Sequence, residues 1–249
     1  MLRMLTRALP VTLALSGPAM ALDLDAMTEA ERETFGAQVR AYLLDNPEVL
    51  MEAIAVLDQR QADAAAQGDS AMIAAHSEAL FDYEGDWVGG NPDGDITVVE
   101  FMDYKCGYCR RAFPEVKELV ESDGNIRYIL KEFPILGEQS LMASQFAIAV
   151  RGLEGDAAYK QAHDALMTMR ADVSEASLET LADSLGADFA AVREEMESPE
   201  VARVIAENRQ LAQAMQVSGT PSFVMGDQML RGYLPLAQMR ELVSAQRDE

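Results

Sequence analysis

The chain has 249 residues, of which 42 are acidic and 20 are basic, and it contains only two cysteines. This length allows one large domain, or one domain with a small second module, and it buries a substantial core without disulfide crosslinks. The formal net charge of −22 argues against nucleic acid and anionic membranes as partners, because phosphate binding requires basic patches. Two cysteines are too few for a disulfide scaffold or a four-cysteine metal site.

Residues 1–21 have the pattern of a secretory signal peptide. Arg3 and Arg7 give a basic start, residues 8–15 are apolar, and the triplet ending at Ala21 is small-x-small. The apolar run is much shorter than the roughly 20 residues of a membrane span. We therefore expect cleavage after Ala21 and export of the mature protein into a compartment where disulfides persist.

Residues 22–85 are predicted to form a helical extension. Thr28 and Glu31 have the spacing of a capping box, and Asn46-Pro47 is typical of a second helix start. Gly68-Asp69 is expected to interrupt that second helix before a further helix over residues 71–80.

An apolar stripe marks this extension, at Leu50, Ile54 and Leu57. Spacings of four and three place these side chains on one face of a helix. Two interpretations stay open: the stripe packs on the main domain, or residues 28–81 join copies of the chain into a homo-oligomer.

Residues 86–249 are predicted to form the main domain. A Gly- and Asp-rich linker, residues 82–95, is expected to lack regular structure. A strand over 96–103, a helix over 110–122 and a strand over 126–133 then predict a parallel βαβ unit. Further elements follow in chain order: helices over 138–153, 157–169, 174–185, 188–197 and 200–216, a hairpin of strands 221–225 and 228–232, and a last helix over 235–246.

The two cysteines, Cys106 and Cys109, lie between the first strand of that unit and its helix. A haem attachment is excluded because Arg110 stands where a histidine is required. A zinc site needs further ligands, and only the isolated His76 and His163 are available. A structural disulfide closing so small a loop contributes little stability. The spacing therefore favours a redox-active pair.

The expected location also explains the reactivity of such a pair. At a helix N-terminus, orphan N–H groups and the helix dipole stabilise the Cys106 thiolate and lower its pKa. Cys109, one turn further on, is shielded and able to resolve a mixed disulfide. Gly107 and Tyr108 between them set the redox poise.

Several motifs make residues 86–249 resemble the DsbA-like thiol:disulfide oxidoreductases of the thioredoxin fold. They are VVEFMDYKCGYC at 98–109, Pro114 in the following helix, and GTPSF at 219–223. The interval of 115 residues from Cys106 to Pro221 (221 minus 106) has the size of a DsbA-type helical insertion. The resemblance implies an α/β, thioredoxin-like fold with an insertion at about 138–217 and an N-terminal helical extension as in ScsC-type members.

The resemblance also implies roles for individual residues. Pro221 is expected to be a cis-proline facing the cysteine pair, and the Thr220 backbone to bind an extended substrate segment. Glu100 is expected to lie buried behind the disulfide and to tune proton transfer, and Lys131 matches the family's buried lysine partner.

Three functions remain open at this point. The first is a periplasmic oxidase acting on reduced or misoxidised secreted proteins, reoxidised by a DsbB-like membrane partner. The second is an oligomeric isomerase or reductase of the ScsC type served by a DsbD-like partner, favoured by Gly-Tyr between the cysteines and by Thr220 before the proline. The third is a copper- or zinc-handling protein using the cysteines with Met167 and Met169. We expect no cofactor and no resident metal.

Overall fold

The computed structural model describes residues 26–248, so the expected signal peptide over residues 1–21 lies outside the described residues. The chain divides into two compact units, one ending at Gln59 and the other beginning at Arg60. The sequence-based boundary after residue 85 is a different division, and it stays a prediction.

The first unit contains α1 (Glu29–Asp45) and the start of α2 (Glu48–Ala75). Thr28 caps α1 as predicted, because its hydroxyl accepts from the Glu31 N–H while the Glu31 carboxylate accepts from the Thr28 N–H. No residue of α1 is buried. Met27 is buried and Leu43 and Val49 are half-buried, but nine large apolar side chains of this unit are exposed, and they are Phe35, Val39, Tyr42, Leu44, Leu50, Met51, Ile54, Val56 and Leu57.

The expected break at Gly68-Asp69 is wrong, because α2 continues through both residues to Ala75. Arg231 donates two hydrogen bonds to the Asp69 carboxylate, at 2.8 and 2.9 Å. This tertiary ion pair favours the helical conformation at a place where a central glycine costs about 1 kcal/mol. The further helix predicted over residues 71–80 is divided in the structure, because residues 71–75 belong to α2 and residues 77–80 to the short α3 (Ser77–Phe81).

One mixed sheet of five strands forms the centre of the second unit, in the order β1-β3-β2-β4-β5. The strands are β1 (Trp87–Gly90), β2 (Ile96–Met102), β3 (Ile126–Glu132), β4 (Ser222–Met225) and β5 (Gln228–Arg231). The predicted βαβ unit is confirmed, since β2 and β3 are parallel and α4 (Gly107–Asp123) connects them. The predicted hairpin is confirmed as the antiparallel pair β4 and β5.

Strand β1 corrects the expectation that residues 82–95 have no regular structure. It pairs antiparallel with β3, from Trp87 opposite Leu130 to Gly90 opposite Arg127. The Trp87 ring stacks on Tyr159, with ring centroids 5.6 Å apart. A glycine-rich segment thus forms a strand because partners far along the chain stabilise it.

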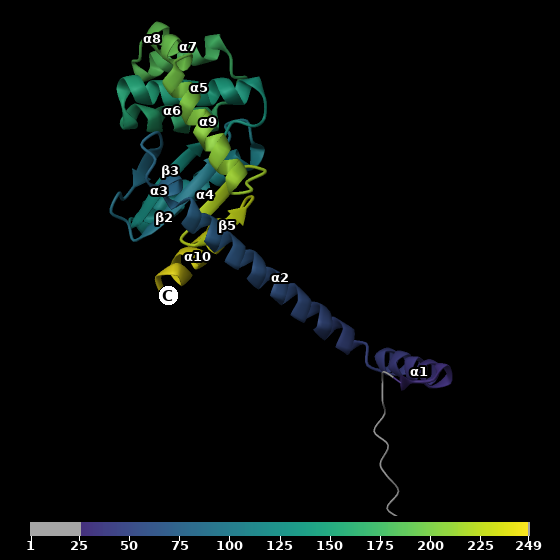
Figure 1. Ribbon diagram of the computed structural model, residues 1–249. Helices are drawn as coiled ribbons and strands as arrows, with labels where there is room; N and C mark the ends of the chain where they lie inside the picture. The colour runs from purple at the N-terminus through teal and green to yellow at the C-terminus, as the bar shows by residue number, and fades with distance from the viewer. Residues whose placement is uncertain (1–25, 249) are drawn as a thin grey trace, which may run out of the picture. The chain divides into compact units, whose positions relative to one another are not determined.

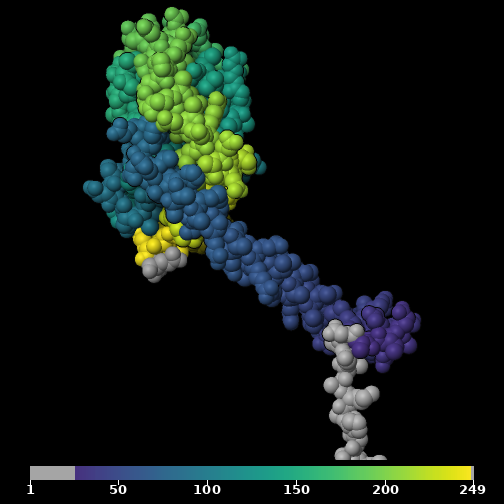
Figure 2. Space-filling model, viewed as in Figure 1, coloured from purple at the N-terminus to yellow at the C-terminus, as the bar shows by residue number. Residues whose placement is uncertain are grey.

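Five helices form the predicted insertion between β3 and β4, and Figure 1 shows them gathered beyond one end of the sheet. They are α5 (Glu138–Glu154), α6 (Asp156–Thr168), α7 (Glu175–Leu185), α8 (Phe189–Met196) and α9 (Pro199–Ala214), and α10 (Leu236–Asp248) follows β5. In Figure 2 their green surface adjoins the blue to teal surface of the sheet-forming segments. Within residues 26–248 we find no helix with the length and apolar character of a membrane span.

The sheet separates two buried clusters of side chains. Val98, Met102, Tyr128 and Leu130 pack with both cysteines and with the helices of the insertion. Val99, Phe101, Ile129 and Val224 pack with Ile73, Leu80, Leu211 and Met215. Because successive residues of a strand point to opposite faces, we call the first side the cysteine face and the second side the opposite face.

Candidate active site

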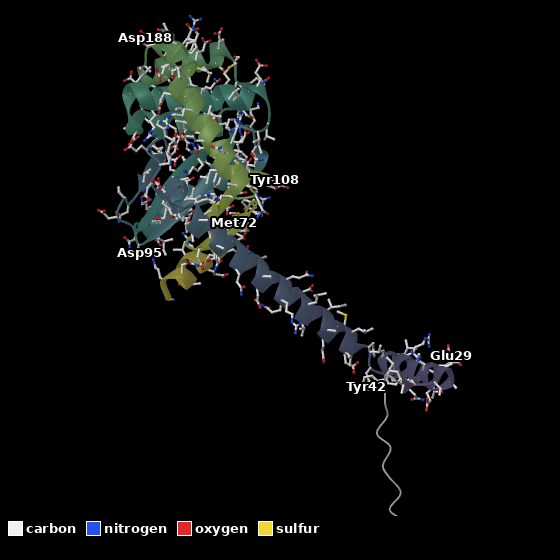
Figure 3. All side chains as sticks on the ribbon, in the orientation of Figure 1. Glu29, Tyr42, Met72, Asp95, Tyr108 and Asp188 are labelled. Carbon is white, nitrogen blue, oxygen red and sulfur yellow. The ribbon has the colours of Figure 1, made fainter. Side chains whose placement is uncertain are left out.

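The cysteine pair lies at the predicted strand-to-helix junction. Strand β2 ends at Met102, Cys106 is the N-cap of α4, and Cys109 lies in its first turn. Both are free thiols; Cys106 is 7% exposed and Cys109 is fully buried. Tyr108 between them is 59% exposed, and Figure 3 shows its side chain at the surface.

The loop before β4 faces the first cysteine. The Thr220–Pro221 peptide bond is cis, as predicted. The Cys106 Sγ lies 3.1 Å from the Thr220 carbonyl oxygen, to which the protonated form of the thiol donates. Residues 114 positions apart in the sequence therefore form one surface around a single sulfur atom.

The two thiols differ strongly in acidity. Hydrogen bonds to the Cys106 sulfur, first from the Cys109 thiol and then from the Thr220 side chain and the N–H groups of Cys109 and Tyr108, lower its pKa to about 5. The same hydrogen bond to Cys106, together with burial and the Glu100 charge, raises the pKa of Cys109. Near neutral pH the pair therefore holds one thiolate, at the more exposed position.

Glu100 is buried on the cysteine face, where the resemblance placed it. Its side chain accepts a hydrogen bond from the Tyr128 hydroxyl. Burial raises the pKa of Glu100 to about 7, the Tyr128 hydrogen bond opposes this rise, and the charge of Cys106 adds to it. A carboxyl group that titrates near neutrality close to a thiol pair has the acidity required of a proton donor and acceptor.

Lys131 does not pair with Glu100, so this part of the prediction is wrong. In the strand register Lys131 stands opposite Phe101, while Glu100 stands opposite Leu130. The side chain is therefore on the opposite face, where it forms a buried ion pair with Asp86 and donates to the Ala79 carbonyl. This geometry holds residues 79–86 against the sheet and gives Lys131 no contact with the thiols.

A buried carboxylate that the sequence reasoning missed organises the loops around the pair. Asp103 accepts from the N–H of Lys105 at 2.7 Å and from the Ser140 hydroxyl at 2.8 Å. It also accepts from the N–H groups of Ile135 and Leu136, at 2.8 and 3.1 Å. One side chain thus holds the start of the cysteine loop and the segment after β3. Its signal in the sequence was an acid directly after a buried strand, three residues before Cys106.

The segment held by Asp103 exposes apolar side chains. Ile135 is 40% exposed and Leu136 is 53% exposed, and Tyr108 is exposed between the cysteines. Exposed aliphatic and aromatic side chains near a reactive thiol suit contact with an unfolded, apolar polypeptide.

Arg110, the residue that excluded a haem site, has a structural role instead. Its guanidinium donates to the Tyr104 carbonyl at 2.7 Å and to the carbonyls of Met169 and Leu166, at 2.5 and 3.3 Å. The side chain therefore joins the end of α6 to the segment before the cysteines.

The residues considered as metal ligands lie apart in the fold. His76 is the N-cap of α3, and His163 is buried in α6 among aromatic rings. Met167 is buried in the same helix. In the part of the chain that the structure describes, no group of three or more His, Cys, Asp or Glu side chains is arranged to hold a metal ion.

Two family models match the chain. The DsbA-like thioredoxin domain matches residues 97–244, and the N-terminal domain of the copper resistance protein ScsC matches residues 31–64. Among curated proteins, a Na(+)/H(+) antiporter of Salinispora arenicola is 32% identical over 151 residues, which are 61% of this chain but 23% of the antiporter. The chain thus spans less than a quarter of that relative. A probable disulfide bond formation protein D of Bacillus cereus is 24% identical, covering 57% of this chain and 71% of that protein.

Solved structures show the same likeness. A thioredoxin-like oxidoreductase from Silicibacter pomeroyi is 41% identical with a TM-score of 0.65, covering 69% of this chain and 98% of that one. The thiol-disulfide exchange protein alpha-DsbA2 of Wolbachia pipientis is 28% identical with a TM-score of 0.69, and the match covers 74% of this chain and 98% of that one. Proteus mirabilis ScsC in a transitional conformation is 29% identical with a TM-score of 0.65, and the match covers 89% of this chain and 97% of that one.

Proposed function

Because the chain belongs to the DsbA-like thioredoxin domain family, we propose that it is an exported enzyme that forms disulfide bonds in secreted proteins of the periplasm. The chain is a protein thiol:disulfide oxidoreductase with a DsbA-like thioredoxin fold and N-terminal helices like those of ScsC. The direction of the reaction, the substrates and the compartment are our inference.

The observation that carries the proposal is the unequal pair of thiols beside the cis-proline loop. In the oxidised enzyme, a substrate thiolate attacks the Cys106 sulfur and the Cys106–Cys109 bond breaks. A second substrate thiolate then attacks the substrate sulfur of this mixed disulfide and releases Cys106. The substrate loses two electrons and two protons, and the enzyme gains both as two thiol groups, of which Cys106 then ionises.

Cys106 is the better leaving group, because its pKa of about 5 stabilises the thiolate. The same stabilisation of the reduced form makes the disulfide more oxidising. This asymmetry favours release of an oxidised substrate over long-lived mixed disulfides.

Glu100 supplies the proton that Cys109 requires in this scheme. When the Cys106–Cys109 bond breaks, Cys109 leaves as a buried thiolate, and its raised pKa drives protonation. The carboxyl of Glu100, with a pKa of about 7, donates that proton and takes it back on reoxidation by a membrane partner.

Substrate binding in this proposal uses the groups around Cys106. The backbone beside Pro221 pairs with an extended segment of the substrate in the manner of an added strand. The exposed Tyr108 and Leu136 contact its apolar side chains.

Cysteine variants test the chemistry. Cys106→Ser should abolish oxidation of a reduced peptide with two cysteines. Cys109→Ser, mixed with the oxidised form of that peptide, should accumulate a mixed disulfide through Cys106, visible by mass spectrometry, because the Cys106 thiolate opens the peptide disulfide and no Cys109 thiol displaces the peptide. An oxidised wild-type protein that leaves the peptide reduced contradicts the proposal, as does Cys106→Ser protein that retains turnover. Ser122→Ala, at the far end of α4, is the matched control.

A second candidate function, an oligomeric disulfide isomerase, is favoured by the match of residues 31–64 to the ScsC N-terminal domain. The exposed Phe35, Val39 and Tyr42, and then Leu50, Ile54 and Leu57, repeat spacings of four and three that suit helix pairing between copies. A DsbD-like partner would keep Cys106 reduced for this activity, whereas a DsbB-like partner would keep it oxidised.

Two measurements separate the candidates. Light scattering of the mature protein should give a dimer or trimer for the isomerase, and Val39→Asp with Ile54→Asp should dissociate it. Reactivation of scrambled ribonuclease by the reduced protein supports isomerase activity. A monomer that oxidises peptides but leaves scrambled ribonuclease inactive excludes it.

Export is tested separately from chemistry. Expression in a bacterium and N-terminal sequencing of the periplasmic fraction should give a chain that begins at Leu22. A chain retained in the cytoplasm with Met1 intact contradicts the proposed compartment.

A further inference from the structure

A cavity of about 450 Å³ lies on the cysteine face, separate from the substrate surface at Thr220 and Tyr108. Helices α4 and α6 and strands β1 and β3 contribute its walls, which include Trp87, Phe113, Val116, Val120, Tyr128 and His163. Its volume is within the usual range of small-molecule sites, and cavities of about 150 Å³ already bind benzene. Aromatic and aliphatic walls of this kind suit a flat apolar ring.

His163 is a deeply buried polar side chain of the wall and is 2% exposed. Burial lowers the pKa of His163 to about 3, so its imidazole is neutral. Its Nδ1 lies 3.2 Å from the Tyr104 hydroxyl, which itself donates to Glu132 at 2.8 Å. Because a hydroxyl has a single proton and Tyr104 donates it to Glu132, we assign the proton of this contact to Nδ1.

Nε2 of His163 therefore carries the lone pair and accepts a hydrogen bond. No described residue donates to it, and His163 lines the cavity. An acceptor on the wall of a mostly apolar cavity selects a ligand with one N–H or O–H group, because such a ligand supplies the hydrogen bond that the protein does not.

The charged groups at the rim balance one another. Lys160 lies 2.5 Å and Lys117 lies 3.4 Å from the carboxylate of Asp164, and Lys117 is 3.9 Å from Glu121. Two lysines face two carboxylates, so the rim presents no free charge to a ligand. A neutral ligand fits these surroundings better than a carboxylate or an amine.

One wall of the cavity also reaches the cysteine site. The Tyr128 ring lines the cavity, and its hydroxyl donates to Glu100. The charge of Glu100 in turn acts on Cys109. A molecule packed against Tyr128 is thus two side chains away from the thiol pair.

We propose that this cavity binds a neutral aromatic molecule of one or two rings that donates a hydrogen bond to Nε2 of His163, and that its binding is coupled to the redox state of the cysteines through Tyr128 and Glu100. The site goes beyond the proposed disulfide exchange. Ligand binding in the cavity is measured without turnover. A protein that fails to bind the ligand can therefore still catalyse disulfide exchange, and an inactive protein can still bind the ligand.

Phenol and toluene are matched probes, because they have nearly the same size and differ in the donor. Trp87 is the only tryptophan of the chain and lines the cavity, so its fluorescence reports occupancy. We expect saturable changes with both probes. His163→Phe, which keeps a ring but removes the acceptor, should weaken phenol binding about tenfold and leave toluene binding unchanged.

Two further variants serve as controls for this binding test. Val120→Phe fills the cavity and should abolish saturation by both probes, while His76→Phe changes the other histidine, which does not line the cavity, and should alter neither. Thermal unfolding confirms that each variant is folded. Linear, non-saturable changes with wild-type protein overturn the site, and equal weakening of phenol and toluene by His163→Phe overturns the acceptor role.

The coupling has its own readout. By reciprocity, a ligand that shifts the redox equilibrium binds the oxidised and reduced proteins with different affinities. We expect the dissociation constants of phenol in the two states to differ by about fivefold, and Tyr128→Phe to abolish the difference. Equal constants in the two states of the wild-type protein overturn the coupling.

Discussion

The two faces of the central sheet both bury ionisable side chains, but with different partners and different consequences. On the cysteine face, Glu100 has a neutral partner, the Tyr128 hydroxyl, and its pKa rises to about 7. On the opposite face, Lys131 has a charged partner, Asp86, and forms a buried ion pair. The two residues are on neighbouring strands, one position out of register.

This difference gives the two residues different roles: Glu100 tunes the thiols, and Lys131 anchors a segment of the chain. A buried acid without a cation titrates near neutrality, so it exchanges protons with a thiol. A buried ion pair keeps a fixed geometry, and here it joins the segment before β1 to the sheet. We therefore expect substitutions on the cysteine face to alter redox chemistry and substitutions on the opposite face to alter stability.

The largest effect is expected from Lys131→Met. This variant leaves Asp86 buried without its cation and should lower the free energy of unfolding by about 3 kcal/mol, measured by urea denaturation. The double variant Lys131→Met/Asp86→Leu should recover most of the loss, because it removes both charges. The Cys106 pKa, followed by thiolate absorbance, should stay near 5. A shift of a full unit would break the separation between the faces.

Glu100→Gln should show a smaller, pH-dependent effect. The carboxyl has an ordinary pKa of 4.5 and a folded value of about 7, so the folded state holds its proton over this interval while the unfolded state loses it. Stability contributed by this group is therefore lost as pH rises from about 4.5 to about 7.

The glutamine variant does not titrate, so it should gain about 2 kcal/mol relative to the wild type between pH about 5 and about 8. Urea denaturation at the two pH values measures this gain. Protonation of Cys109 during turnover should also slow in the variant. A difference between the two proteins that is independent of pH would contradict the raised pKa.

Tyr128→Phe tests the neutral partner. The hydroxyl lowers the pKa of Glu100 against the larger effect of burial, so its removal should raise that pKa further. We expect a loss of about 1 kcal/mol in unfolding free energy above neutral pH and a smaller loss in acid, where Glu100 is protonated. Tyr42→Phe, in the first unit, is the control. A loss that is larger in acid would reverse the assigned sign.

The smallest effect is expected from Thr220→Val. Thr220 lies in the loop before β4 and not on either face of the sheet. Its side chain is one of the groups that lower the Cys106 pKa, after the Cys109 thiol. The pKa of Cys106 should rise by a fraction of a unit in the variant, and Thr180→Val, at an exposed position of α7, should leave it unchanged. A Cys106 pKa above neutrality in Thr220→Val would show that Thr220, rather than Cys109, dominates the tuning.

Local signals predicted much of the architecture. The capping residues Thr28 and Ser174 start α1 and α7 as expected, because a cap is decided within four residues. The βαβ unit and the final hairpin followed from short apolar runs and turn residues. The cis-proline followed from the resemblance at GTPSF, a motif that spacing alone does not interpret.

Long-range pairing explains the errors. Strand β1 exists because β3 pairs with it, and α2 runs through Gly68 while Arg231 binds Asp69. The partner of Lys131 was mistaken because the expectation rested on the resemblance alone, whereas the register sends Glu100 and Lys131 to opposite faces. Asp103 was missed because its four donors come from segments up to 37 residues away.

The sequence by itself determined that two scarce cysteines stand where a strand turns into a helix, because strand, turn and helix signals act over a few residues. It also determined that Cys106 is more acidic than Cys109. Cys106 stands at the N-terminus of the helix, where free N–H groups and the helix dipole stabilise a thiolate, whereas Cys109 lies one turn further on. Only the tertiary structure decided which buried charge reaches the thiols, which anchors the chain, and that an aromatic cavity lies behind Tyr128. Those outcomes depend on strand register and on contacts between distant segments. Before the sheet is assembled, the same sequence is compatible with Lys131 paired with Glu100 and with Lys131 paired with Asp86.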